Sequence, residues 1–213
     1  MSENIISFEK PTIESIYKQA FKTMLDQIVV CIANTVIFFI VCFLLGITII
    51  GLLAIPAVIG GYTESLIRAA RGDKVGIGDF FKAGLNKFGT LLGAGILFIL
   101  GVGIGLICFI IPGIYLMVRW FFVTYLIVDK DIGVSEAFQK SGEMVSNIFW
   151  EVLAVFIINA VIESIGCSSI GVGAILTTPF ILLVSAHYYL GLSQEETVQQ
   201  IPEEQDNSEN APE

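Results

Sequence analysis

Charged residues are scarce in this chain. They make up 15% of its 213 residues, against about 25% in a typical soluble domain. Basic residues are the rarer kind, with 11 Lys and Arg against 20 Asp and Glu, and the isoelectric point is near 4.6. A nucleic-acid-binding protein normally needs a basic surface, so that class of partner is disfavoured. Hydrophobic residues reach 55% and the mean hydropathy is +0.83, which excludes an intrinsically disordered chain.

Residues that commonly carry catalysis or bind metals are also few. The chain has one histidine, His187, and four dispersed cysteines that form no Cys-x-x-Cys pair. No zinc-binding His-Glu-x-x-His, Gly-x-Ser-x-Gly elbow or Walker loop is present. We therefore predict no enzyme activity, no catalytic residue, no metal and no cofactor. A disulfide between Cys108 and Cys167 remains an open alternative, because both approach the predicted outer face.

Long uncharged runs dominate the rest of the sequence. Residues 27–63, 88–118 and 164–194 contain no Asp, Glu, Lys or Arg. A membrane-spanning helix needs about 20 apolar residues, so each run fits a hairpin of two helices once flanking residues are included. Pro56 and the Pro112-Gly113 pair interrupt the first two runs. We predict an all-α membrane protein with six transmembrane helices in residues 1–191, at 27–47, 51–71, 88–108, 111–128, 148–165 and 170–191.

The segments before the three predicted hairpins look alike. Each carries a Phe beside a Lys or Gln, at Phe21, Phe81 and Phe138, with apolar residues at helical spacing on one side. Such amphipathic helices lie in the headgroup region with their apolar side towards the acyl chains. We expect three helical hairpins, each preceded by an amphipathic interfacial helix, and membrane lipids as partners.

The basic residues give the orientation. Ten of the eleven Lys and Arg fall on one predicted face, and the three hairpin tips have none. Since Lys and Arg favour the cytoplasmic side, both termini are predicted to be cytoplasmic. Residues 192–213 contain seven acidic residues and no basic one, so the net charge without them is −9 + 7 = −2. We expect this acidic segment to be a disordered cytoplasmic tail.

Arg119 is the exception, because it falls inside a predicted span. Helical rise places it near the bilayer midplane, where a charge is costly and needs a partner. Asn159 and Glu163 are the best candidates, since they are four residues apart and share one helical face. This intramembrane polar site has two interpretations: an ion pair that holds helices together, or a substrate or ion site.

One stretch resembles a known family. Residues 111–122, 126–129 and 134–141 combine a Pro112-Gly113-Ile114-Tyr115 tip, an Arg among aromatics, an acidic residue and an Ala-x-x-x-Ser segment. The stretch resembles the membrane domain found with some glycerophosphodiester phosphodiesterases, and related uncharacterised bacterial and archaeal integral membrane proteins. The resemblance implies a six-helix module of a prokaryotic cytoplasmic membrane. In that family the phosphodiesterase is a separate soluble barrel, which these residues do not encode.

Two functional hypotheses follow. The lack of a catalytic set favours a non-enzymatic membrane scaffold or accessory module. The alternative is a small transporter or lipid-handling protein with a cavity around Arg119. An intramembrane enzyme is disfavoured, because no nucleophile and base are paired. The sequence indicates neither a protein partner nor an oligomeric state.

Overall fold

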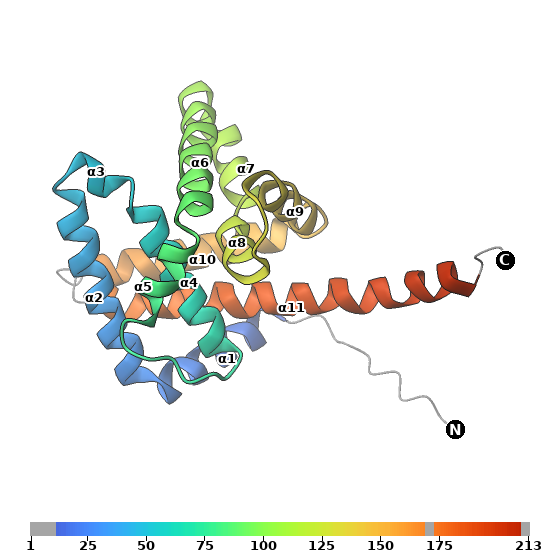
Figure 1. Cartoon of the computed structure of the whole chain (residues 1–213), viewed down its shortest axis with the longest axis horizontal. Coiled ribbons are helices and arrows are strands. Elements are labelled where there is room, and N and C mark those ends of the chain that lie inside the picture. Colours follow the sequence, from blue (N-terminus) through green and yellow to red (C-terminus); the bar gives the residue numbers. More distant parts are fainter. Residues whose placement is uncertain (1–11, 169–172, 210–213) are drawn as a thin grey trace.

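The computed structural model describes residues 12–168 and 173–209, in which every regular element is a helix (Figure 1). In chain order the helices are α1 (Ile13–Asp26), α2 (Ile28–Gly46), α3 (Ile49–Leu52), α4 (Ile55–Ala70), α5 (Asp79–Asn86), α6 (Phe88–Cys108), α7 (Ile110–Arg119), α8 (Val123–Lys130), α9 (Val134–Ser146), α10 (Phe149–Ser168) and α11 (Ala174–Glu209).

Five stretches in the described residues are long and apolar enough to cross a membrane. They are Ile28–Gly46, Phe88–Cys108, Ile110–Lys130, Phe149–Ser168 and Ala174–Gln194. Many of their apolar side chains face outwards; Ile107, for example, is 87% exposed. Outward apolar surface on this scale suits an acyl-chain environment and not water. The all-helical, membrane-embedded character expected from the sequence is therefore confirmed.

The second predicted span, 51–71, is divided. It comprises the short α3 and then α4, with a break just before Pro56. Proline cannot continue a preceding helix but fits the first turn of a new one, which explains the break. At 16 residues, α4 is not among the five span-length helices. Its interior position is clear from Tyr62 and Ile67, which are both fully buried.

The fourth predicted span, 111–128, is also divided. The regular helical ladder is interrupted between α7 and α8, where the Phe121 and Val123 N–H groups bond to carbonyls three residues back, leaving Trp120 to Phe122 as a joint. Helix α9 supplies the missing partners: the Ser141 hydroxyl donates to the Arg119 carbonyl at 3.0 Å and accepts from the Phe122 N–H at 3.3 Å. A side chain from a distant segment thus stabilises the break, which helical periodicity alone does not reveal.

The last helix is longer than predicted. Helix α11 runs to Glu209, so residues 192–209, expected to be disordered, continue it. Glu and Gln are good helix formers, and extension of an existing helix needs no new nucleus, which accounts for the difference. In Figure 1 this end of α11 projects away from the body. The first residues of the sixth predicted span, 170–172, lie outside the described residues.

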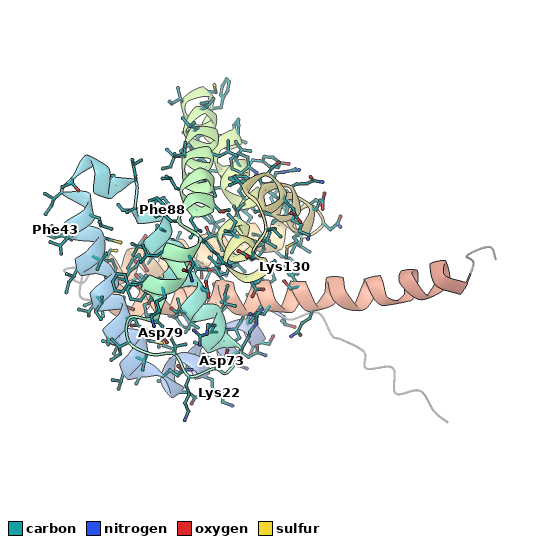
Figure 2. The ribbon with its side chains drawn as sticks, in the orientation of Figure 1. Lys22, Phe43, Asp73, Asp79, Phe88 and Lys130 are labelled. Carbon is teal, nitrogen blue, oxygen red and sulfur yellow. The ribbon has the colours of Figure 1, made fainter. Side chains whose placement is uncertain are left out.

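The helix pairs are splayed. Figure 1 shows α6 and α7 standing side by side, whereas α10 and α11 lie across the view. The pairs meet in an aromatic core where the Phe122 ring lies 5.8 Å from Tyr188 and 6.2 Å from Tyr125. Figure 2 shows Phe43 near the outer end of α2 and Lys22 at the opposite side of the molecule. Apolar hairpin ends thus diverge from a shared core.

Candidate functional site

Asn159 is buried, and both the oxygen and the nitrogen of its side-chain amide form hydrogen bonds. Its Oδ1 accepts a hydrogen bond from the Tyr17 hydroxyl at 2.9 Å, and its Nδ2 donates to Ser185 Oγ at 3.3 Å. Burial raises the pKa of Tyr17 to about 12, so the phenol stays protonated and donates at neutral pH. The contacts tie α1, α10 and α11 together. Asn159 therefore acts in this structure as a link between helices and does not contact Arg119.

Glu163 forms its hydrogen bonds with α11 and not with Arg119. Its carboxylate accepts from the hydroxyls of Thr177 at 2.9 Å and Thr178 at 3.0 Å, across the α10–α11 pair. The two threonines directly precede Pro179, and their side chains hold the carboxylate. The ion pair between Arg119 and Glu163 that the sequence suggested is not formed among the described residues.

Arg119 lies at the end of α7, partly buried. Its Nη1 donates to the Tyr115 hydroxyl at 2.9 Å, one helical turn earlier. Gly142 of α9 is so close that a Cβ there would lie 2.9 Å from Arg119 Nε. Arg119 is therefore positioned beside the helix α9, and the structure does not bring it together with the other two predicted site residues.

The tip motif builds the α6–α7 pair. Gly113 packs directly on α6, where an added Cβ would lie 2.4 Å from a methyl group of Leu106. Pro112 lies in the first turn of α7, where its missing N–H costs no hydrogen bond. Tyr115 reaches two elements at once: its hydroxyl meets Arg119, and its ring lies 5.3 Å from that of Phe149. The motif thus has a structural basis and also supports Arg119.

A charge cluster that the sequence analysis missed joins three helices. Asp129 of α8, with a side chain 9% exposed, forms an ion pair with Arg71 of α4 at 2.6 Å and accepts from the Tyr189 hydroxyl of α11 at 2.9 Å. Nearby, Lys87 Nζ donates to the Val128 carbonyl at 2.7 Å. In the sequence these charged residues are grouped at the ends of predicted helices. That grouping does not indicate which residue pairs with which.

An apolar cleft of about 750 Å³, here called the hairpin cleft, lies between α3, α4, α6, α7, α8 and α10. Its lining is apolar except for the Thr124 hydroxyl and the Trp120 indole N–H. The residues are Leu52, Ile55, Pro56, Ile59, Leu91, Ala94, Gly95, Phe98, Ile99, Met117, Trp120, Phe121, Val123, Thr124 and Phe156.

The hairpin cleft lies next to Arg119 and not around it. Met117, Trp120 and Phe121 line it, but Arg119 does not. The Trp120 ring is held edge-on against Phe138 of α9, with centroids 4.8 Å apart. The alternative hypothesis placed a cavity around Arg119; the hairpin cleft is instead lined by its neighbours in sequence, Met117, Trp120 and Phe121.

No protein family, curated protein or solved structure matches this chain. The case for a function therefore rests on the geometry alone. In the described part of the chain, no three His, Cys, Asp or Glu side chains are arranged to hold a metal ion. All four cysteines are free thiols, and Cys108 and Cys167, considered above as a disulfide, are both exposed.

Proposed function

We propose that this chain is a polytopic integral membrane protein that handles lipid, with an acyl chain as the occupant of the hairpin cleft. The observation that carries the proposal is the cleft itself. Its volume of about 750 Å³ lies within the range of about 300–1,000 Å³ that is usual for ligand pockets. A polar solute would lose its hydrogen bonds to water there, because the lining offers almost none in return. An acyl chain has none to lose.

The proposal includes a topology. We propose that six helical segments cross a prokaryotic cytoplasmic membrane as three hairpins, with α1, α5 and α9 at the inner interface and both termini inside. The ion pairs of Arg71 with Asp129 and of Lys87 with Asp131 support a common charged end. The resemblance of residues 111–141 to prokaryotic membrane modules is consistent with this arrangement.

The topology can be tested with cysteine labelling in intact cells. The native Cys108, exposed at the end of α6, should react with an impermeant maleimide from outside. A cysteine introduced as Lys74→Cys, in a background with Cys108→Ser and Cys167→Ser, should react only after the cells are permeabilised. Labelling of Lys74→Cys from outside would show the orientation to be inverted.

The two tryptophans allow a direct test of the cleft. In a Trp150→Phe variant, Trp120 of the hairpin cleft is the single fluorophore. Lipid with brominated acyl chains, titrated into the detergent-purified protein, should quench Trp120 in a saturable way. Unbrominated lipid should reverse the quenching by competition. Linear quenching without saturation would mean that no acyl chain is held in the cleft.

Matched variants of α6 make the test specific. Ala94→Phe fills the cleft, because Ala94 lines it, and should weaken the saturable quenching of Trp120. Ile96→Phe, on the same helix but outside the lining, should leave it unchanged. If both variants behave like the parent protein, the site of quenching is not the hairpin cleft and the proposal fails.

A second candidate function is a membrane scaffold or accessory module without catalytic activity. The favouring observation is that polar groups of α10 and α11 are matched to each other, as in the Asn159–Ser185 and Glu163–Thr177 hydrogen bonds. Such groups hold the helices in place and leave no polar site for a solute. Absence of saturable lipid binding, with a stable monodisperse protein, would favour this function.

A further inference from the structure

The hairpin cleft cannot select one lipid from another by tail burial alone. A lipid tail in the bilayer already lies in hydrocarbon, so moving it against Leu and Ile side chains gains little from the hydrophobic effect. Selection must then come from contacts with the headgroup. A headgroup site needs a charged side chain near the cleft that has no counter-charge among the described residues.

Arg119 is such a side chain. A guanidinium has five N–H donors, and among the described residues one hydrogen bond, to the neutral Tyr115 hydroxyl, engages this group. The carboxylates of the neighbouring helices have other partners: Glu143 accepts from Gln139 at 2.9 Å, and Glu163 accepts from two threonines. The positive charge is thus not neutralised within the described part of the chain.

The backbone that carries Arg119 is fixed. Its carbonyl accepts from Ser141 of α9, and the next residue, Trp120, is wedged against Phe138 of the same helix. Gly142 leaves room for the guanidinium, because a Cβ there would lie 2.9 Å from Nε. The guanidinium is therefore held in a defined place, and most of its N–H donors have no acceptor among the described residues.

The contact between Trp120 and α9 brings the cleft and the Arg119 guanidinium close to each other. Trp120 lines the hairpin cleft, and its contact residue Phe138 lies one turn of α9 before Gly142. Apolar helices surround the cleft, whereas α9 is amphipathic, with Ala137 buried and Glu136 exposed. An apolar cleft beside a cation at an amphipathic helix matches the two parts of an anionic phospholipid.

We infer that Arg119 binds the phosphate of an anionic phospholipid whose acyl chain enters the hairpin cleft. This inference rests on the proposed lipid-handling function and adds the headgroup class. The planar guanidinium binds two phosphate oxygens at once, which gives it strength and direction that a neutral partner cannot match. Tyr115 keeps the guanidinium turned along α7.

The experiment compares two lipids on the full-length purified protein. Phosphatidylglycerol and phosphatidylcholine with identical acyl chains are offered in equal amounts in a neutral detergent, and native mass spectrometry counts the lipid retained. Both lipids carry a phosphate, but the choline ammonium offsets its charge in phosphatidylcholine and would repel the guanidinium. The parent protein should therefore retain the anionic lipid about tenfold better. Arg119→Gln should abolish this preference. Arg68→Gln, which changes a partly buried arginine of α4, should leave it unchanged.

Two further arms identify the ligand. Arg119→Lys keeps the charge but loses the two-point contact, so the preference should fall several-fold; this variant also decides the matter if Arg119→Gln does not fold. Millimolar inorganic phosphate should not displace the lipid. Displacement by phosphate alone, or an Arg119→Gln variant that is folded and keeps the parent preference, would overturn the inference.

The outcome is separable from that of the cleft test. If Ala94→Phe removes saturable quenching while Arg119→Gln keeps the lipid preference, the cleft function stands and the headgroup site fails. If Arg119→Gln removes the preference while Ala94→Phe leaves the quenching unchanged, the headgroup site stands and the acyl chain lies elsewhere.

Discussion

At the scale of single residues, the polar groups inside the membrane region divide into two kinds. Asn159 and Glu163 have their hydrogen bonds satisfied by neighbouring helices. Arg119 has a neutral partner and spare donors. Since an unmatched polar group in hydrocarbon is costly, the first kind stabilises the fold, and the second needs something from outside the described residues.

The independence of Arg119 and Glu163 can be measured. Because they do not contact each other, Arg119→Gln and Glu163→Gln should change stability additively, to within about 0.5 kcal/mol. The measurement is thermal unfolding of both single variants and the double variant in detergent. A coupling energy above about 1 kcal/mol would show that the two charges do form a pair.

Asn159 should matter for stability more than its size suggests. Asn159→Ala removes the acceptor of the Tyr17 hydroxyl and one donor to Ser185, although Ser185 still donates to the Ile181 carbonyl; the change should cost about 1–3 kcal/mol. Unfolding by a titration with a denaturing detergent gives this value. Asn86→Ala, at an exposed position at the end of α5, serves as control and should have little effect. An equal loss in both variants would contradict the assigned role.

At the scale of elements, the close approach of α6 and α7 depends on Gly113. A Cβ at this position would lie 2.9 Å from the backbone N of Leu106 as well as against its side chain. Gly113→Ala should therefore push the helices apart and destabilise the protein by about 1–3 kcal/mol.

The matched control for Gly113→Ala is Gly103→Ala. Position 103 has nothing within 4 Å of an added Cβ, so this change should be neutral or slightly stabilising, by up to about 1 kcal/mol, through helix propensity. Comparison of the two melting temperatures checks the prediction. It is wrong if Gly113→Ala is as well tolerated as Gly103→Ala.

The helices could be predicted from the sequence where charge alone bounds them. The predicted spans 27–47 and 88–108 correspond to α2 and α6 within one residue at each end. The break between α7 and α8 could not be predicted, because it depends on Ser141 from another element. Helical rise gave the position of Arg119 along its span, but not the direction of its side chain. The structure therefore gives Arg119, Asn159 and Glu163 separate hydrogen-bond partners.

At the scale of the whole molecule, the charge cluster at Asp129 holds α8 against α11, as the aromatic core does, and also connects both to the end of α4. Asp129→Asn removes the charge that Arg71 and Tyr189 both contact. It should cost about 1–3 kcal/mol, typical of hydrogen bonds to a charged group. Asp131→Asn, whose side chain is 80% exposed in its pair with Lys87, should cost much less. Both are measured as shifts in thermal unfolding.

The hairpin cleft also belongs to this scale, since six helices line it and no local sequence pattern marks it. Its residues read in the sequence as ordinary apolar positions of separate spans. Only the splay of the helix pairs (Figure 1) turns them into a cavity. The composition predicted the environment of the protein; the relative tilt of the pairs, which composition does not contain, creates the proposed site.

The joint at residues 120–122 has a consequence for the fit between protein and bilayer. A continuous helix responds to a thinner or thicker membrane by tilting as a whole. The α7–α8 segment consists of rods of 10 and 8 residues, about 15 and 12 Å long, and the two Ser141 hydrogen bonds at the joint hold them to α9. Trp120 lies in that joint and in the cleft wall, so a bilayer that tilts this segment would move α9 and the wall of the cleft together with it.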